Sequence, residues 1–172
     1  MPHGHTELAT GRSGRAADGG GAVYISTKGR YGTKALFELA LHQGEGPQAL
    51  RAIAEHQGLS EHYLEQLIAP LRKAGLVQSV RGAQGGYVLA RDPATITVGD
   101  VLRVLEGPVT PTECALEHYD FSRCCANPGV CPDRDVWVRV RKGIEEVVDN
   151  ITLQDLVDDW QRTHERSPMY YI

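Results

Sequence analysis

Four cysteines are the residues of this 172-residue chain whose type and spacing most clearly indicate chemistry. They fall within 18 residues of a polar segment that also contains proline and glycine. Clustered thiolates are soft ligands, and they favour an iron–sulfur cluster (2Fe–2S or 4Fe–4S) or zinc. Metal-free redox thiols and inert cysteines are the remaining alternatives. The four residues are Cys114, Cys124, Cys125 and Cys131.

Other classes of chemistry are disfavoured by the same inventory. The seven histidines are scattered, and the adjacent Cys124 and Cys125 lack the C-x-x-C spacing of dithiol oxidoreductases, so we expect no enzyme. The chain has no run of 18 apolar residues, and residues 1–22 lack the apolar stretch of a secretory signal. We therefore expect a cytoplasmic protein without a membrane partner, and in a reducing compartment four cysteines do not predict a disulfide framework.

Charge is distributed unevenly around a net value of −4. Residues 23–91 carry eight lysines and arginines against five glutamates, or +3, whereas residues 92–172 carry eight against fifteen acids, or −7. Such asymmetry predicts a basic face that meets a polyanion and an acidic half with a different task.

The cysteines lie in residues 110–132, a stretch too long for an idle loop in a compact domain, so something must order it. The elements that flank it are predicted from apolar periodicity, caps and glycine stops. We expect helices over 26–42, 48–57, 60–73, 98–106 and 133–150, a short helix containing Leu153, Leu156, Val157 and Trp160, and a hairpin of 76–81 with 87–90.

Two short helices joined at Gly58 and followed by a hairpin predict a winged helix-turn-helix. Ala54 and Gly58 satisfy its need for a small residue and a positive-φ turn, and Ser60 caps the second helix. The glycine-rich hairpin tip includes Gly85 and Gly86, with Arg81 at its base to enter a minor groove. Lys28, Arg30 and Lys34 are expected to contact phosphates.

The helix over 133–150 carries an apolar stripe at spacings of three and four residues, which suits a partner helix. We therefore expect a mainly α fold with a small β-wing: a winged helix-turn-helix domain plus a long dimerisation helix. The stripe contains Trp137, Val140, Ile144 and Val147. The expected segments are a disordered extension (1–22), the DNA-binding domain (23–107), a cysteine-containing sensor loop (108–132), the dimerisation and C-terminal helices (133–161) and a tail (162–172).

Residues 23–172 resemble the IscR/CymR-type family of dimeric winged-helix transcriptional repressors. The resemblance is carried by ISTKGRYGTKALFELA, LSEHYLEQLIAPLRKAGLV, SVRGAQGGYVLARDPATITVGDVLRVLEGP and DNITLQDLV. It implies that the recognition helix starts over residues 60–66, that Arg81 reaches the minor groove of double-stranded DNA, and that the long helix crosses its twin in a homodimer. Tyr63, Glu65 and Gln66 would lie near base edges.

The IscR-like branch of the family implies the ligands of a cluster. Cys114 and Cys131 match the first and last ligand positions, and Cys125 gives the C-x5-C interval of the middle one, for which Cys124 can substitute. Arg134 stands where IscR-like sequences place a histidine ligand, so the fourth ligand stays open. The choices are Cys124, His118, Glu113, Asp133 or a residue of the partner subunit.

The CymR-like branch is matched by SEHYLEQL, PLRKAGLV, RGAQGGYVL, GPVTP and the ending MYYI. It implies a response to cysteine and sulfur status, and an O-acetylserine sulfhydrylase that binds Tyr170, Tyr171 and Ile172. The chain is therefore expected to be a repressor that responds to iron–sulfur or sulfur status. The competing hypothesis is a protein-interaction or cluster-carrying module that partners a cysteine-biosynthesis enzyme and does not read DNA.

Overall fold

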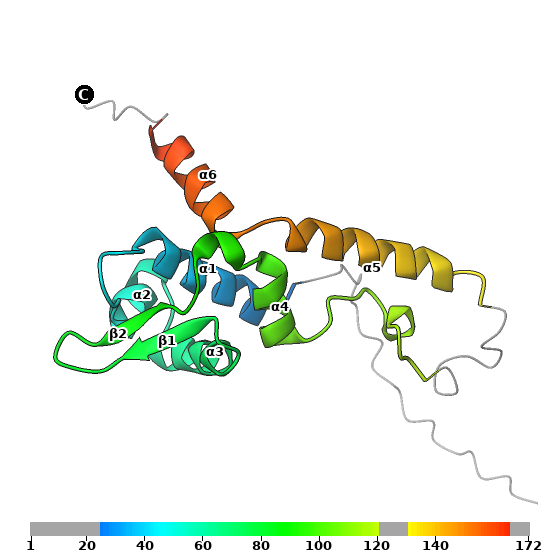
Figure 1. The fold of residues 1–172 in the computed structure, drawn as a ribbon. Helices are drawn as coiled ribbons and strands as arrows, with labels where there is room; N and C mark the ends of the chain where they lie inside the picture. Colours follow the sequence, from blue (N-terminus) through cyan, green and yellow to red (C-terminus); the bar gives the residue numbers. More distant parts are fainter. Residues whose placement is uncertain (1–24, 121–130, 166–172) are drawn as a thin grey trace, which may run out of the picture.

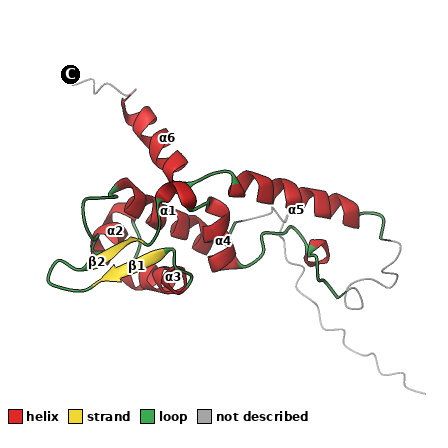
Figure 2. Ribbon diagram, viewed as in Figure 1, coloured by secondary structure: helices red, strands yellow, loops and turns green. Residues whose placement is uncertain are grey.

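The computed structural model describes residues 25–120 and 131–165, which form α-helices and one two-stranded antiparallel sheet (Figures 1 and 2). This confirms the mainly α fold with a small β-wing. The elements in chain order are α1 (Thr27–Leu41), α2 (Leu50–Gln57), α3 (Glu61–Lys73), β1 (Val77–Val80), β2 (Gly86–Leu89), η1 (Pro93–Thr95), α4 (Val98–Glu106), η2 (Glu113–Ala115), α5 (Arg134–Asp149) and α6 (Leu153–Glu165).

A single apolar core lies among α1, α2, α3 and α4, with α6 packed against α1. Helix α1 is the central helix, because it contacts α2, α3, α4 and α6. Its Leu36 is fully buried, and Leu64 and Ile68 of α3 are buried in the same core. The cap expected at Ser60 is present at the start of α3, and Ser26 caps α1; each side chain accepts a hydrogen bond from a backbone amide.

The turn between α2 and α3 is made by Gly58, which adopts a φ of 65° at the end of α2. Helix α2 begins at Leu50 rather than at the predicted Gln48. The reason is that the Gln48 backbone pairs with Tyr87 of β2, through two hydrogen bonds of 2.9 Å between main-chain amides and carbonyls. This pairing attaches the wing to the residue that leads into the helix-turn-helix.

Helices α4 and α6 begin side by side with the same capping arrangement. Thr97 and Asp100 form a capping box on α4, and Thr152 and Asp155 exchange equivalent side-chain hydrogen bonds at the start of α6. The Val98 amide also donates to the carbonyl of Ile151 at 2.8 Å. The start of α6 is thereby fixed to α4, and so to the head formed by α1–α4 and the wing.

Helix α6 is longer than predicted, and helix α5 lies apart from the core. Helix α6 continues to Glu165, past the expected boundary at residue 161, because Thr163 and the stacked pair of Trp160 and His164 support a further turn. Helix α5 extends away from the wing (Figure 1). Its Arg141 is buried and pairs with Glu145 and Glu117. No helix in residues 25–120 or 131–165 is long and apolar enough to cross a membrane.

Candidate nucleic-acid interface and cysteine site

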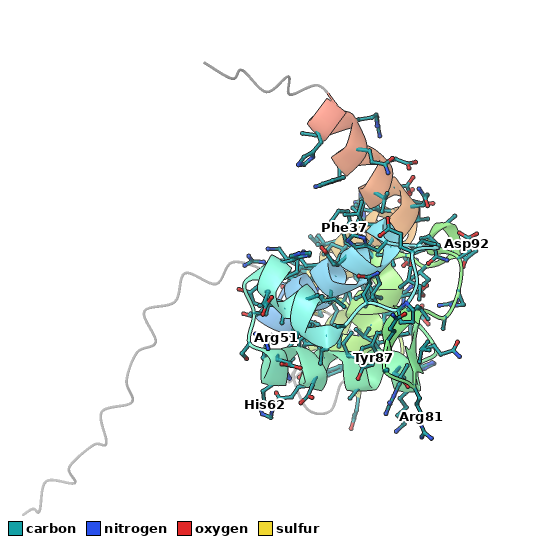
Figure 3. All side chains as sticks on the ribbon, turned by 90° about the vertical axis from the view of Figure 1, so that its left-hand side faces the viewer. Phe37, Arg51, His62, Arg81, Tyr87 and Asp92 are labelled. Atoms are coloured by element: carbon teal, nitrogen blue, oxygen red, sulfur yellow. The ribbon has the colours of Figure 1, made fainter. Side chains whose placement is uncertain are left out.

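The first two turns of α3 present polar side chains on the outside and apolar side chains inward. Ser60, Glu65 and Gln66 are exposed, whereas Leu64 and Leu67 are buried. The Ser60 hydroxyl accepts from the Tyr63 amide at 3.2 Å, so the start of α3 is held by its own cap. In Figure 3, His62 of α3 and Arg81 of the wing lie at the end of the molecule opposite α6.

Tyr63 connects this edge to the basic start of α1. Its ring meets Tyr31 in a T-shaped contact, with 6.1 Å between centroids and 88° between planes. The Lys34 ammonium lies 5.7 Å from the centre of the Tyr31 ring, and the Arg30 guanidinium lies 6.0 Å from it. Lys28 is exposed on the first turn of α1. Two of the cations expected to contact phosphates, Arg30 and Lys34, are therefore brought beside the exposed face of α3.

The wing exposes Arg81 at the end of β1. Gly85 and Gly86 are required by the backbone of the wing itself, because a Cβ at Gly86 would overlap the Gln48 carbonyl and one at Gly85 would overlap that of Val80. Gly86 thus lets the wing approach the segment that leads into α2, and Gly85 lets the hairpin turn close on itself. Their direct contact with DNA stays a prediction.

His62 is a residue of this surface that the sequence analysis missed. Its side chain is 81% exposed, its Nδ1 lies 3.8 Å from a Glu65 carboxylate oxygen, and its Nε2 lies 3.1 Å from Gln66 Nε2. Spacings of three and four residues from Glu65 and Gln66 place it on the same helix face. That spacing was the signal available in the sequence.

The cysteine segment is anchored where η2 meets the start of α5. Cys114 of η2 and Cys131 just before α5 are half-buried free thiols. The Arg134 Nε donates to the Cys114 carbonyl at 3.2 Å, which ties the two sides of the segment together. Cys124 and Cys125 lie outside the described residues.

Cys114 lies on η2, which contacts α5, and Cys131 lies three residues before α5; two such thiols fit the chemistry of a thiolate-held cluster. Arg134 stands where IscR-like sequences place a histidine ligand, and its side chain donates a hydrogen bond to the Cys114 backbone. Asp133 accepts from the Cys131 thiol at 2.9 Å and from the Trp137 indole at 3.1 Å, and these bonds, the thiol's first, lower the pKa of the carboxyl. His118 and Glu113 are exposed, so the geometry leaves the fourth ligand open.

The predicted dimer stripe of α5 divides into two groups. Val140 and Val147 are 39% and 58% exposed. Trp137 is half-buried, and Ile144 is half-buried where it lines a cavity of about 280 Å³ with Leu102 of its own chain. The exposed members are therefore the ones free to meet another molecule. Tyr170, Tyr171 and Ile172, predicted to bind an enzyme, lie outside the described residues.

Comparison with known proteins gives one consistent result. The model of the Rrf2 family, described as iron-dependent transcriptional regulators, matches residues 25–159. The transcriptional regulator CymR of Bacillus subtilis is 49% identical over 148 residues, covering 86% of this chain and 99% of CymR. Among solved structures, IscR of T. potens has a TM-score of 0.68 at 54% identity, covering 86% of this chain and 96% of IscR. CymR of B. subtilis, titled the global cysteine regulator, has a TM-score of 0.65 at 51% identity, covering 78% and 96%.

Proposed function

The chain belongs to the Rrf2 family of transcriptional regulators, and from this premise we propose that it is a homodimeric repressor whose DNA binding follows iron–sulfur or cysteine status. Its relatives are named transcriptional regulators, so the chain is a DNA-binding regulator and not an enzyme. The observation that carries the proposal is the placement of the exposed α3 edge and Arg81 at one end of the molecule (Figure 3).

In this proposal the exposed face of α3, which carries Ser60, Glu65 and Gln66, enters a major groove. Glu65 accepts from a base amino group and Gln66 forms donor and acceptor bonds with a base edge, while Arg81 inserts a guanidinium into the adjacent minor groove. Lys28, Arg30 and Lys34 neutralise phosphates, and the Tyr31–Tyr63 contact keeps two of these cations beside α3. Phosphate contacts supply affinity, and the base contacts supply sequence preference.

A homodimer is supported by an exposed stripe on α5. Val136, Val140, Gly143 and Val147 follow one another at spacings of four, three and four residues, and the three valines are 39–58% exposed. A glycine inside a helix costs about 1 kcal/mol relative to alanine, so Gly143 fits a place where a second helix approaches closely. We propose that Val140 and Val147 form the centre of the seam, with Trp137 and Ile144 at its border.

An iron–sulfur cluster is the sensing group that the cysteines support best. Cys114, Cys125 and Cys131 would hold it, and Cys124 is the alternative to Cys125. When bound, such a cluster supplies a group whose occupancy depends on iron, sulfide and oxygen. Arg134 joins the Cys114 backbone to α5, so a rearrangement of the cysteine segment on cluster loss would reach the dimer helix through this contact.

The cysteine-responsive alternative is favoured by the identity with CymR, titled the global cysteine regulator. In that version an O-acetylserine sulfhydrylase binds Tyr170, Tyr171 and Ile172 and acts as co-repressor. Calorimetry with the enzyme tests it: deletion of Ile172 should abolish binding and leave DNA affinity unchanged. Equal affinities for the full and shortened chains, or no binding by either, would remove the enzyme from the proposal.

The experiment that tests the proposal begins with chain purified without air. DNA sites are selected from a random pool, and fluorescence anisotropy then compares the selected site with scrambled DNA at fixed salt. A repressor should prefer its site by at least about 1,000-fold. Equal affinity for both DNAs would favour the cluster-carrying module. Visible absorption of the same sample shows whether a cluster is present, independently of the DNA result.

A further inference from the structure

A second group of metal-ligating side chains lies far from the cysteines in sequence, where α1 meets α2. It consists of Glu38 and His42, one turn apart on α1, and His56 near the end of α2. One ligand atom from each residue lies within 4.8 Å of the other two. Glu38 is the buried member, with a side chain only 8% exposed, and its carboxylate faces both imidazoles. A buried carboxylate needs polar partners, and its contacts here include two histidines rather than a lysine or an arginine.

The two distances from the Glu38 carboxylate to the imidazoles are close to those around a tetrahedral ion. Zn²⁺ bonds of about 2.0–2.1 Å to nitrogen and oxygen place neighbouring ligand atoms about 3.3 Å apart. The Glu38 Oε1 lies 3.5 Å from His42 Nε2 and 2.7 Å from His56 Nδ1. The first separation already suits the ion, and the second must widen by a fraction of an ångström as the ion takes the place of the hydrogen bond between Glu38 and His56. His56 is 62% exposed, so its side chain can make this shift and leaves solvent access for a water ligand.

Two further side chains hold the ligands in orientation. The Nδ1 of His42 lies 2.7 Å from a Glu45 carboxylate oxygen, which directs Nε2 toward Glu38. A carboxylate that accepts from the remote nitrogen of a ligating histidine is the usual outer partner of a zinc site. On the other side, the Gln57 amide donates to Glu38 Oε2 at 2.9 Å and leaves Oε1 to face the imidazoles.

We propose that Glu38, His42 and His56 form a site for Zn²⁺ or a similar divalent transition metal, separate from the cysteine segment. Two imidazoles and one carboxylate are a donor set that zinc accepts, with water as the fourth ligand. The bound ion links α1 to α2, the pair of helices that supports α3. It therefore stabilises the DNA-binding head without a contribution from the thiols, and this inference does not depend on the sensing chemistry proposed above.

The test must separate this site from the cysteines, which also bind zinc. Zn²⁺ is titrated by calorimetry into the full chain with all four cysteines changed to serine, and circular dichroism verifies that the chain is folded. We expect one Zn²⁺ per chain and a higher Tm with zinc, because a ligand that binds the folded state stabilises it. His56→Ala and Glu38→Gln should each weaken binding at least tenfold, and Glu45→Gln should weaken it less.

His62→Ala and His164→Ala are the matched controls, since both histidines lie outside the cluster, and they should leave the affinity unchanged. No zinc binding by the four-serine chain, or equal affinity with and without His56, would overturn the proposal and leave an ordinary ion-paired cluster.

If the four-serine chain does not fold, X-ray absorption of the zinc-loaded wild type replaces calorimetry. Nitrogen and oxygen ligands lie about 0.2 Å closer to zinc than sulfur does, and His56→Ala should remove that shell. An unchanged shell would equally refute the site.

Discussion

Arg103 of α4 and Asp149 at the end of α5 form a bidentate ion pair. The two nitrogen–oxygen distances are 2.6 Å (Nη2 to Oδ1) and 3.2 Å (Nη1 to Oδ2). The hydrogen bond to Asp149 is the main reason that the pKa of Arg103 is raised. Gly99 of α4 leaves room for this pair, because a Cβ there would overlap the Asp149 carboxylate. The pair thus joins the head to the helix that carries the exposed valine stripe.

The first prediction measures this pair by a double-mutant cycle. Arg103→Ala, Asp149→Ala and the double variant are unfolded in urea, and the coupling free energy should be about 0.5–1 kcal/mol, near the upper end for exposed pairs because the contact is bidentate. The coupling should decrease in high salt. The exposed Arg51–Glu55 pair, held through a single nitrogen at 2.8 Å, is the control and should give a smaller value. Equal coupling in the two pairs would mean that bidentate geometry adds nothing here.

The helices could be predicted because their signals are local. Helix α4 was predicted over its observed range, since Gly107 marks its end and its apolar residues recur at helical spacing. The start of α2 was predicted two residues too early because the pairing of Gln48 with Tyr87 is a contact between segments 39 residues apart. Such a contact leaves no local pattern.

The site was predictable to a similar degree. The exposed positions of Ser60 and Arg81 agree with the sequence analysis, since caps and hairpins are local features. On α5, adjacent apolar stripes share the same period, so spacing alone did not distinguish Val140, which is exposed, from Ile144, which lines a cavity in its own chain. The Glu38–His56 contact joins residues 18 positions apart and depends on how α1 and α2 pack.

The second prediction concerns DNA recognition. Arg81→Ala should weaken binding to the selected site by about 1–3 kcal/mol, and Glu65→Ala should change sequence preference more than general affinity. Fluorescence anisotropy on matched and scrambled DNA measures both effects. Arg162→Ala, an exposed residue of α6, is the control of equal charge change and should have little effect. Equal losses on both DNAs for Glu65→Ala would exclude this residue from base contact.

The third prediction concerns the dimer seam. Val140→Glu and Val147→Glu should each give monomers that bind DNA poorly, because an exposed stripe is then charged and two half-sites are no longer engaged together. Light scattering measures the mass. Ile144→Glu should also lower the Tm of the monomer, since this side chain faces a cavity lined by Leu102. Dimers that persist in both valine variants would place the interface elsewhere.

The fourth prediction concerns the cluster ligands. If Cys114, Cys125 and Cys131 hold a cluster, changing any one of them to alanine should abolish the visible absorption of anaerobically purified protein. Cys124→Ala should leave it largely intact and serves as the control of identical chemistry. A colourless Cys124→Ala beside a coloured Cys125→Ala would exchange the two assignments. Absorption that survives all four substitutions would contradict thiolate ligation.

The fifth prediction follows from His42, whose pKa is raised above 6.5, first by its hydrogen bond to Glu45 and further by the charges of Glu45 and Glu38. A pKa that is higher in the folded state stabilises the fold below the unfolded value, and this contribution disappears as pH rises through the folded pKa. With a metal chelator present, Glu45→Gln should therefore cost more unfolding free energy at about pH 5.5 than at about pH 8. Urea unfolding at the two pH values gives the difference, and NMR titration of His42 should show a lower pKa in the variant.

Arg51→Gln, which removes an exposed charge from α2, serves as the control and should show little such pH dependence. A loss in Glu45→Gln that is the same at both pH values would mean that Glu45 stabilises the turn after α1 by contacts other than the protonated imidazole.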